Sequence, residues 1–138
     1  MKVLICGGRD VGRSGMVTDA LSAETAAEAT RASREILFVN NKLDDLHAQL
    51  CFSHVICGSS KGAERLGLDW AQLKGIPTTI FKSRGSLFRR ETVNSRNLRM
   101  LKDGQPDMCI AFGGAEVTED LLSHAAGIGI KIIRAKFG

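Results

Sequence analysis

The sequence is poor in aromatic residues: it contains no tyrosine, one tryptophan and six phenylalanines among 138 residues. Proteins that bind single-stranded nucleic acid usually stack the bases on aromatic side chains inside a basic groove. The scarcity of aromatics therefore disfavours a dedicated nucleic-acid-binding protein. A net charge of +4 and a pI near 9.1 are nevertheless compatible with nucleic acid or with a small anionic ligand.

Long hydrophobic runs are also missing. No apolar stretch approaches the ~18 residues that a membrane-spanning helix requires. The short apolar stretch after Lys2 is too brief for a signal peptide. We therefore expect a cytoplasmic protein with no membrane partner. A length of 138 residues predicts a single domain over residues 1–138.

Metal-binding and phosphate-binding fingerprints are absent as well. The four cysteines show no C-x-x-C spacing and the three histidines are scattered, so we expect no metal and no cofactor. Cys6, Cys57 and Cys109 each lie in an apolar run, which predicts buried free thiols in a reducing compartment. Neither G-x-x-x-x-G-K-[ST] nor G-x-G-x-x-G occurs in the chain.

Short apolar runs alternate with helical patterns along the chain. Near-continuous apolar strands are typical of a parallel sheet covered on both faces, and their alternation with helices predicts an α/β fold. We expect a Rossmann-like, doubly wound parallel sheet of about five strands in the order 3-2-1-4-5, with helices on both faces. The predicted strands are Val3–Cys6, His54–Cys57, Thr78–Phe81, Asp107–Phe112 and Ile130–Ile133. The predicted helices are Lys61–Lys74, Thr92–Lys102, Thr118–Ala126 and a stretch from Met16 to Leu50 that forms one helix or two, with Asn40–Asn41 as a plausible break.

Glycine-rich turns follow three of the predicted strands. In such sheets ligands bind beyond the carboxyl ends of the strands, where the strand order reverses. Glycine lets the backbone approach a ligand, and the next helix directs free N–H groups and a positive dipole end to the same place. The hydroxyl groups and the lysine of the second turn favour phosphate. The three turns are Gly7-Gly8-Arg9-Asp10, Gly58-Ser59-Ser60-Lys61-Gly62-Ala63-Glu64 and Gly113-Gly114-Ala115-Glu116-Val117-Thr118.

Several polar residues have both a structural and a functional interpretation. Arg9 and Asp10 either form a salt bridge that holds their loop, or Arg9 places its guanidinium on a phosphate or carboxylate. Asn97 shares a predicted helix face with apolar residues, so it needs a partner there, either a neighbouring loop or a ligand. Lys61 lies at a helix start, where the dipole disfavours a cation, and is predicted to hold the phosphate of a ligand. Trp70 is predicted to lie in the core.

Four stretches of the chain carry a further signal: VLICGGRD, VICGSSKGAERLGLDWAQLKGIP, NSRNLRMLKDGQPDMCIAFGG and TEDLLSHAAGIGI. In order and spacing they resemble the YspA-like branch of the SLOG superfamily, over nearly the whole chain apart from residues 13–50. The resemblance implies a Rossmann-like domain, of bacterial or phage origin, that binds a nucleotide or nucleotide-derived molecule and forms a homo-oligomer. The ligand-binding residues that it implies are Gly7, Gly8, Arg9, Asp10, Gly58, Ser59, Lys61, Gly62, Glu64, Arg96, Asn97, Gly113, Gly114 and Thr118, to which the phosphate-binding pattern adds Ser60.

Two relatives of this branch imply alternatives. The Lonely Guy phosphoribohydrolases would imply hydrolysis of the N-glycosidic bond of nucleoside monophosphates, for which Glu64, Glu116 and Asp120 are the candidate carboxylates. The catalytic glutamate of their P-G-G-x-G-T-x-x-E motif is not matched, because Leu121 stands three places after Thr118. The DNA-processing protein DprA would imply a nucleic-acid-binding module, using Arg84, Arg89, Arg90 and Arg99.

Overall fold

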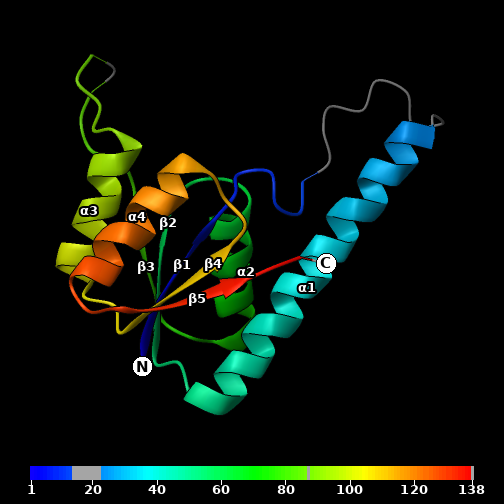
Figure 1. Cartoon of the computed structure of the whole chain (residues 1–138), viewed down its shortest axis with the longest axis horizontal. Coiled ribbons are helices and arrows are strands. Elements are labelled where there is room, and N and C mark those ends of the chain that lie inside the picture. The colour runs from blue at the N-terminus through cyan, green and yellow to red at the C-terminus, as the bar shows by residue number, and fades with distance from the viewer. Residues whose placement is uncertain (14–22, 87, 138) are drawn as a thin grey trace.

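Short parallel strands form the centre of the molecule, and they lie where the apolar runs predicted them (Figure 1). The structure is a computed structural model that describes residues 1–13, 23–86 and 88–137. Its strands are β1 (Lys2–Gly7), β2 (His54–Gly58), β3 (Thr78–Phe81), β4 (Met108–Phe112) and β5 (Lys131–Ala135). They pair in parallel throughout, in the order β3-β2-β1-β4-β5. The predicted Rossmann-like fold with strand order 3-2-1-4-5 is confirmed.

Helices cover both faces of this sheet. Within the described ranges they are α1 (Ala23–Leu50), α2 (Ala63–Lys74), α3 (Val93–Gly104) and α4 (Glu116–Gly127). Helices α1 and α2 lie on one face, and α3 and α4 lie on the other (Figure 1). Successive residues of β1 alternate between the two cores: Val3 and Ile5 pack toward α1 and α2, and Leu4 packs toward α3 and α4. The predicted burial of Trp70 in the first core is confirmed.

Helix α1 continues without interruption through Asn40–Asn41, so of the two alternatives the structure contains one helix and not the possible break. Val39, Leu43 and Leu46 form a buried stripe across this region and pack into the core. Burial of that stripe outweighs the modest helix propensity of asparagine, which differs from that of alanine by less than about 1 kcal/mol. Residues 16–22 of the predicted helix lie outside the described residues.

The other boundaries fall within two residues of those predicted, because local signals fix them. Gly75 ends α2 in the left-handed conformation, with φ 72°. Thr92 caps α3 by accepting a hydrogen bond from the Ser95 N–H at 3.1 Å. Helix α4 begins two residues earlier than predicted, at Glu116, and this extra half-turn brings its first N–H groups close to the end of β4.

The predicted burial of Cys6, Cys57 and Cys109 is confirmed, whereas Cys51 is exposed. No helix in the described ranges has the length and apolar character needed to cross a membrane. Across the same ranges, no cluster of three or more His, Cys, Asp or Glu side chains is placed to hold a metal ion.

Candidate functional site

The carboxyl ends of β1 and β4 lie side by side, and the chain leaves them toward opposite faces of the sheet. This is the point at which α/β sheets bind ligands. A cleft of about 820 Å³ opens there. Its walls are Cys6, Gly7, Gly8, Arg9, Asp10 and Val11 after β1; Arg31 and Glu35 of α1; Ser60 and Glu64 near the start of α2; Val93 and Asn97 of α3; Gly113, Gly114, Ala115, Glu116, Val117, Thr118 and Leu121 after β4; and Phe137.

Backbone contacts tie the three glycine-rich turns together. The Gly8 N–H donates to the Phe112 carbonyl at 3.0 Å, and the Gly8 carbonyl accepts from the Ala63 N–H at 3.0 Å. Gly62 packs so closely on this loop that a Cβ atom there would overlap the carbonyl oxygen of Gly8. The second turn therefore supports the first through its backbone, while the Lys61 side chain is exposed outside the cleft wall.

The turn after β4 requires glycine for its conformation. Gly113 has φ 64° and Gly114 has φ 110°, and side-chain-bearing residues rarely adopt such values. A Cβ atom on Gly8 would lie 3.3 Å from the Gly114 nitrogen, so the turns after β1 and β4 face each other across a narrow gap. The chain can thus bring two backbone segments against one ligand.

Helix α4 begins at this turn without a capping side chain. Its N-cap residue is Ala115, and its first backbone hydrogen bond runs from the Glu119 N–H to the Ala115 carbonyl at 2.9 Å. Among the described residues, no group accepts a hydrogen bond from the N–H groups of Glu116, Val117 or Thr118, all of which line the cleft. Free N–H groups and the positive end of the helix dipole make this wall suitable for an anion.

A buried ion pair underlies the opposite wall. Arg96 is only 2% exposed, and its Nη2 atom donates to Glu64 Oε1 at 2.9 Å and to Asn97 Oδ1 at 2.6 Å. The second carboxylate oxygen of Glu64 accepts from the Ser60 N–H at 3.0 Å. Glu64 and Asn97 line the cleft, whereas Arg96 lies behind them. A Cβ atom on Gly58 would overlap this ion pair, which explains the glycine at the end of β2.

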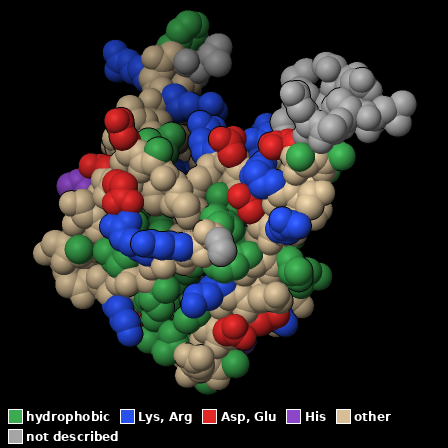
Figure 2. All heavy atoms as spheres, turned by 45° about the vertical axis from the view of Figure 1, so that its right-hand side comes forward, with side chains coloured by type: hydrophobic (Ala, Val, Ile, Leu, Met, Phe, Trp, Pro, Cys, Tyr) green, Lys and Arg blue, Asp and Glu red, His purple; other side chains and the backbone are tan. Residues whose placement is uncertain are grey.

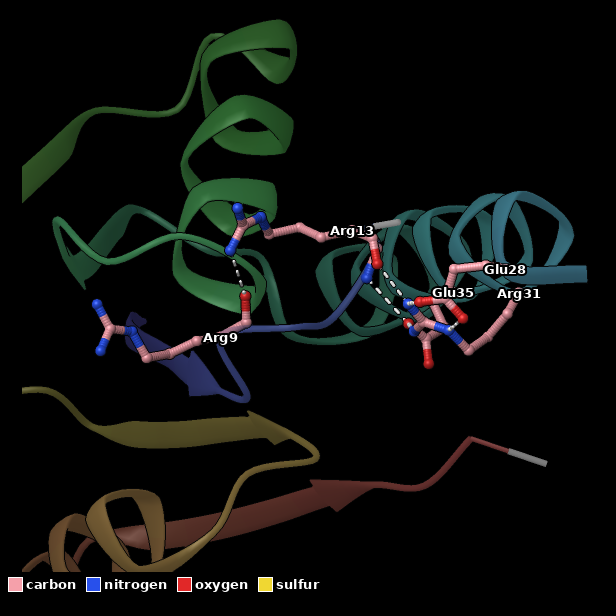
Figure 3. Close-up of polar contacts among 6 residues, drawn as sticks. Arg9, Arg13, Glu28, Arg31 and Glu35 are labelled. Atoms are coloured by element: carbon pink, nitrogen blue, oxygen red, sulfur yellow. Dashed lines mark hydrogen bonds and ion pairs between the residues drawn. The ribbon is translucent and has the colours of Figure 1, made fainter. Parts of the chain in front are cut away.

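Helix α1 supplies a wall that sequence reasoning missed. Arg31 is held by Glu28, by Glu35 and by the carbonyl oxygen of Arg13, and Glu35 also accepts from the Gly12 N–H at 2.9 Å (Figure 3). Hydrogen bonding with Glu28 raises the pKa of the Arg31 guanidinium above its usual value. The i,i+3 and i,i+4 spacing of these charges is common on solvated helix faces, so the sequence alone carries no signal that they reach a ligand site.

Among the described residues that line the cleft, Arg9 is the cation without a side-chain partner. Arg9 and Asp10 are exposed side by side, and within the described residues no ion pair joins them. The salt-bridge interpretation of this pair is therefore not what the structure contains. The Arg9 side chain points away from the cluster on α1 (Figure 3). Within the part of the chain that the structure describes, only the Arg9 backbone carbonyl is engaged, and it accepts from Arg13 Nη1 at 3.5 Å.

The structure brings most of the predicted site residues together. Those that line the cleft are Gly7, Gly8, Arg9, Asp10, Ser60, Glu64, Asn97, Gly113, Gly114 and Thr118, and those that do not are Gly58, Ser59, Lys61, Gly62 and Arg96. Of the candidate catalytic carboxylates, Glu64 and Glu116 line the cleft. Asp120 lies outside its wall, 3.6 Å from His124 Nε2.

The thiol of Cys6 borders the cleft but is not a reactive group. It is 2% exposed and hydrogen bonds to the Ile110 carbonyl at 3.7 Å. Burial raises the pKa of the Cys6 thiol well above its usual value. Because the thiolate is the nucleophilic form, Cys6 contributes packing rather than chemistry.

A basic arm, residues 82–91, rises from the same sheet edge between β3 and α3 (Figure 1). Basic side chains gather near the hydrophobic tip of the arm (Figure 2). Phe88 of this segment is 91% exposed. Glu91 holds the base of the arm, accepting from the Arg84 N–H at 3.0 Å and from the Arg99 guanidinium at 2.9 Å. Arg99 is therefore engaged, whereas Arg84, Arg89 and Arg90 have exposed side chains with no ion-pair partner in the described residues.

The chemistry of the cleft is inferred from its own residues. No protein-family model matches the chain, and neither the curated proteins nor the solved structures give a significant match.

Proposed function

We propose that this protein binds a nucleotide, or a small molecule derived from one, in the cleft between the ends of β1 and β4, and that it acts as a sensor or sequesters that ligand. The observation that carries the proposal is the start of α4, where three unpaired N–H groups follow the Gly113–Gly114 turn and line the cleft. The resemblance of the motifs to the YspA-like branch of the SLOG superfamily supports the same ligand class.

The charges of the cleft favour a ligand with few phosphates. Arg9 is the free cation among the described lining residues, because Arg31 is neutralised by its carboxylate partners. Asp10 and Glu116 add negative charge to the same walls. A nucleoside monophosphate satisfies Arg9 and the α4 N–H groups with less repulsion than a triphosphate.

The proposal can be tested by titration calorimetry with AMP and adenosine, after native mass spectrometry of freshly purified protein for a co-purifying nucleotide. Arg9→Met should weaken AMP by about 1–2 kcal/mol, the usual scale of a charge-assisted contact, and leave adenosine unchanged. Lys61→Met is the matched control, since it removes the same charge from an exposed position outside the cleft wall. Equal losses in both variants, or no nucleotide binding at all, would contradict the proposal.

Hydrolysis of a nucleotide N-glycosidic bond has less support. Glu64 is bound to Arg96 and Asp120 lies outside the cleft wall, which leaves Glu116 as the one unpaired candidate among the described carboxylates named for this role. Release of adenine from AMP by the purified protein, detected by chromatography, would favour a nucleotide hydrolase. The absence of release would favour a binding protein.

A second candidate function is the binding of single-stranded nucleic acid by the basic arm. The segment carries four basic residues and one acidic residue, so most of the net charge of +4 is concentrated there. Three unpaired arginines beside the exposed Phe88 ring suit phosphates and a stacked base. The affinity for a fluorescent oligonucleotide should then fall steeply with salt and be weakened by Phe88→Ala. Salt-independent binding, or an unaffected variant, would contradict this function.

A further inference from the structure

The buried guanidinium of Arg96 fixes the orientation of the Asn97 amide. The Nε and Nη2 atoms of Arg96 both donate to Asn97 Oδ1, at 3.2 and 2.6 Å. A guanidinium group has donors only, so the amide oxygen must face it and the amide NH2 must face away. The chemistry of the pair, rather than the fit of one rotamer, sets this orientation.

The NH2 group of Asn97 is left as a donor for the cleft. Asn97 is 3% exposed and lines the cleft, and within the described residues no group accepts a hydrogen bond from its Nδ2 atom. In the same residues, no fully buried side-chain nitrogen or oxygen lacks a partner. The Nδ2 atom therefore reaches the surface, and the cleft is the surface that Asn97 borders.

Glu64 places an acceptor beside this donor. Its Oε1 accepts one hydrogen bond, from Arg96 Nη2, whereas Oε2 accepts from Arg96 Nη1 at 3.3 Å and from the Ser60 N–H at 3.0 Å. A carboxylate oxygen can accept two hydrogen bonds, so Oε1 retains capacity for one more. Because Arg96 Nη2 contacts both Glu64 and Asn97, the two side chains are held as neighbours on one rigid support.

We propose that Glu64 and Asn97 form a subsite for the two neighbouring hydroxyl groups of a ribose, with the Asn97 NH2 donating to the 2′-hydroxyl and Glu64 accepting from the 3′-hydroxyl. This subsite rests on the proposed binding of a nucleotide in the same cleft. A vicinal diol can donate and accept at neighbouring atoms, which the pair of side chains requires. Acidic side chains hold ribose hydroxyls in other nucleotide-binding α/β domains. Arg96 is a positioning residue, because it acts through Glu64 and Asn97.

The subsite is tested by titration calorimetry with AMP, GMP, CMP and UMP and with their 2′-deoxy counterparts. The protein should bind each ribonucleotide about tenfold more tightly than its deoxy form, because loss of the 2′-hydroxyl leaves the Asn97 donor without a partner. Ribose 5-phosphate should be preferred over 2-deoxyribose 5-phosphate by a similar factor, because the subsite reads the sugar and not the base.

Asn97→Leu keeps the approximate size of the side chain but removes its donor, and it should reduce the preference for ribose to about threefold or less. Asn94→Leu is the matched control, because it makes the same change at an exposed position of α3 outside the cleft wall. It should keep the full preference.

Four results would overturn the subsite. Equal affinity for ribonucleotides and deoxynucleotides would contradict the ribose subsite but would not contradict the proposed function. Discrimination among bases without a preference for ribose assigns the pair to a base edge instead. An unchanged preference for ribose in Asn97→Leu would rule out the proposed role of Asn97. Failure of every nucleotide to bind overturns both the subsite and the proposed function.

Discussion

Breaking the buried ion pair between Arg96 and Glu64 should destabilise the protein strongly. Glu64→Gln keeps the size of the side chain but leaves the Arg96 guanidinium, 2% exposed, without a counter-charge. Removing one partner of a buried pair costs about 3–5 kcal/mol, because the other charge stays out of water uncompensated. The amide oxygen of glutamine can still accept one hydrogen bond, so we expect a loss near the lower end, about 3 kcal/mol. For a chain of this size that lowers the melting temperature by about 10 °C.

The assay is urea unfolding followed by the fluorescence of Trp70, the single tryptophan, which is buried in the core. Glu119→Gln is the matched control, because it breaks the ion pair with Arg134, in which both side chains are about half exposed. An exposed pair contributes less than about 1 kcal/mol, so this control should unfold close to the parent.

A double-mutant cycle separates the pair from its surroundings. Arg96→Met alone should also be costly, since it leaves Glu64 buried without its cation. The variant carrying both changes should lose less than the sum of the single losses, by about 2 kcal/mol. Strict additivity, or a loss in Glu64→Gln no larger than in Glu119→Gln, would refute the reasoning.

Two further predictions concern groups outside this pair. Hydrogen bonds from Arg99 and then from the Arg84 N–H lower the pKa of the Glu91 carboxyl from 4.5 to about 2. Its contribution to stability is therefore complete above about pH 4.5 and is lost as the pH falls toward 2; Arg99→Met should return the carboxyl titration, followed by NMR, toward 4.5. A thiol reagent at mild alkaline pH should label Cys51 alone in the native protein, because burial raises the pKa of Cys57 and Cys109 to about 12 and that of Cys6 well above its usual value. Rapid labelling of a second native thiol, or titration of Glu91 near 4.5 in the parent, would contradict these two predictions.

The sequence allowed the sheet to be predicted because each strand is a short apolar run with a clear end. Val3–Cys6 and Met108–Phe112 are buried on both faces, and such short apolar runs are typical of the central strands of a covered parallel sheet. The possible break at Asn40–Asn41 is absent because the unfavourable helix propensity of asparagine is a weak effect. It was outweighed by the burial of Val39 and Leu43, which depends on contacts far along the chain.

The candidate site was predictable where it depends on strand ends, and not where it depends on how helices approach each other. Gly8 and Gly113 could be assigned to one sheet edge from the strand order alone. Arg31 and Glu35 could not, because their contact with the loop after β1 is set by the position of a long helix relative to that loop. Asn97 was expected to bind either a loop or a ligand, and the pattern did not indicate that its amide oxygen is held by the neighbouring Arg96.

Gly58 shows that the presence of a glycine in the sequence does not by itself reveal why glycine is needed there. A glycine at a strand end suggests a turn that needs unusual backbone angles. Gly58, however, does not adopt a left-handed backbone conformation. It is needed because any side chain would overlap Arg96 and Glu64. A buried ion pair can often be replaced by apolar side chains without loss of stability. Stability alone therefore does not explain why this protein contains the ion pair between Arg96 and Glu64. What the pair does provide is a fixed acceptor on Glu64 and a fixed donor on Asn97 at the wall of the cleft, which is the arrangement that we propose for recognition of a ribose.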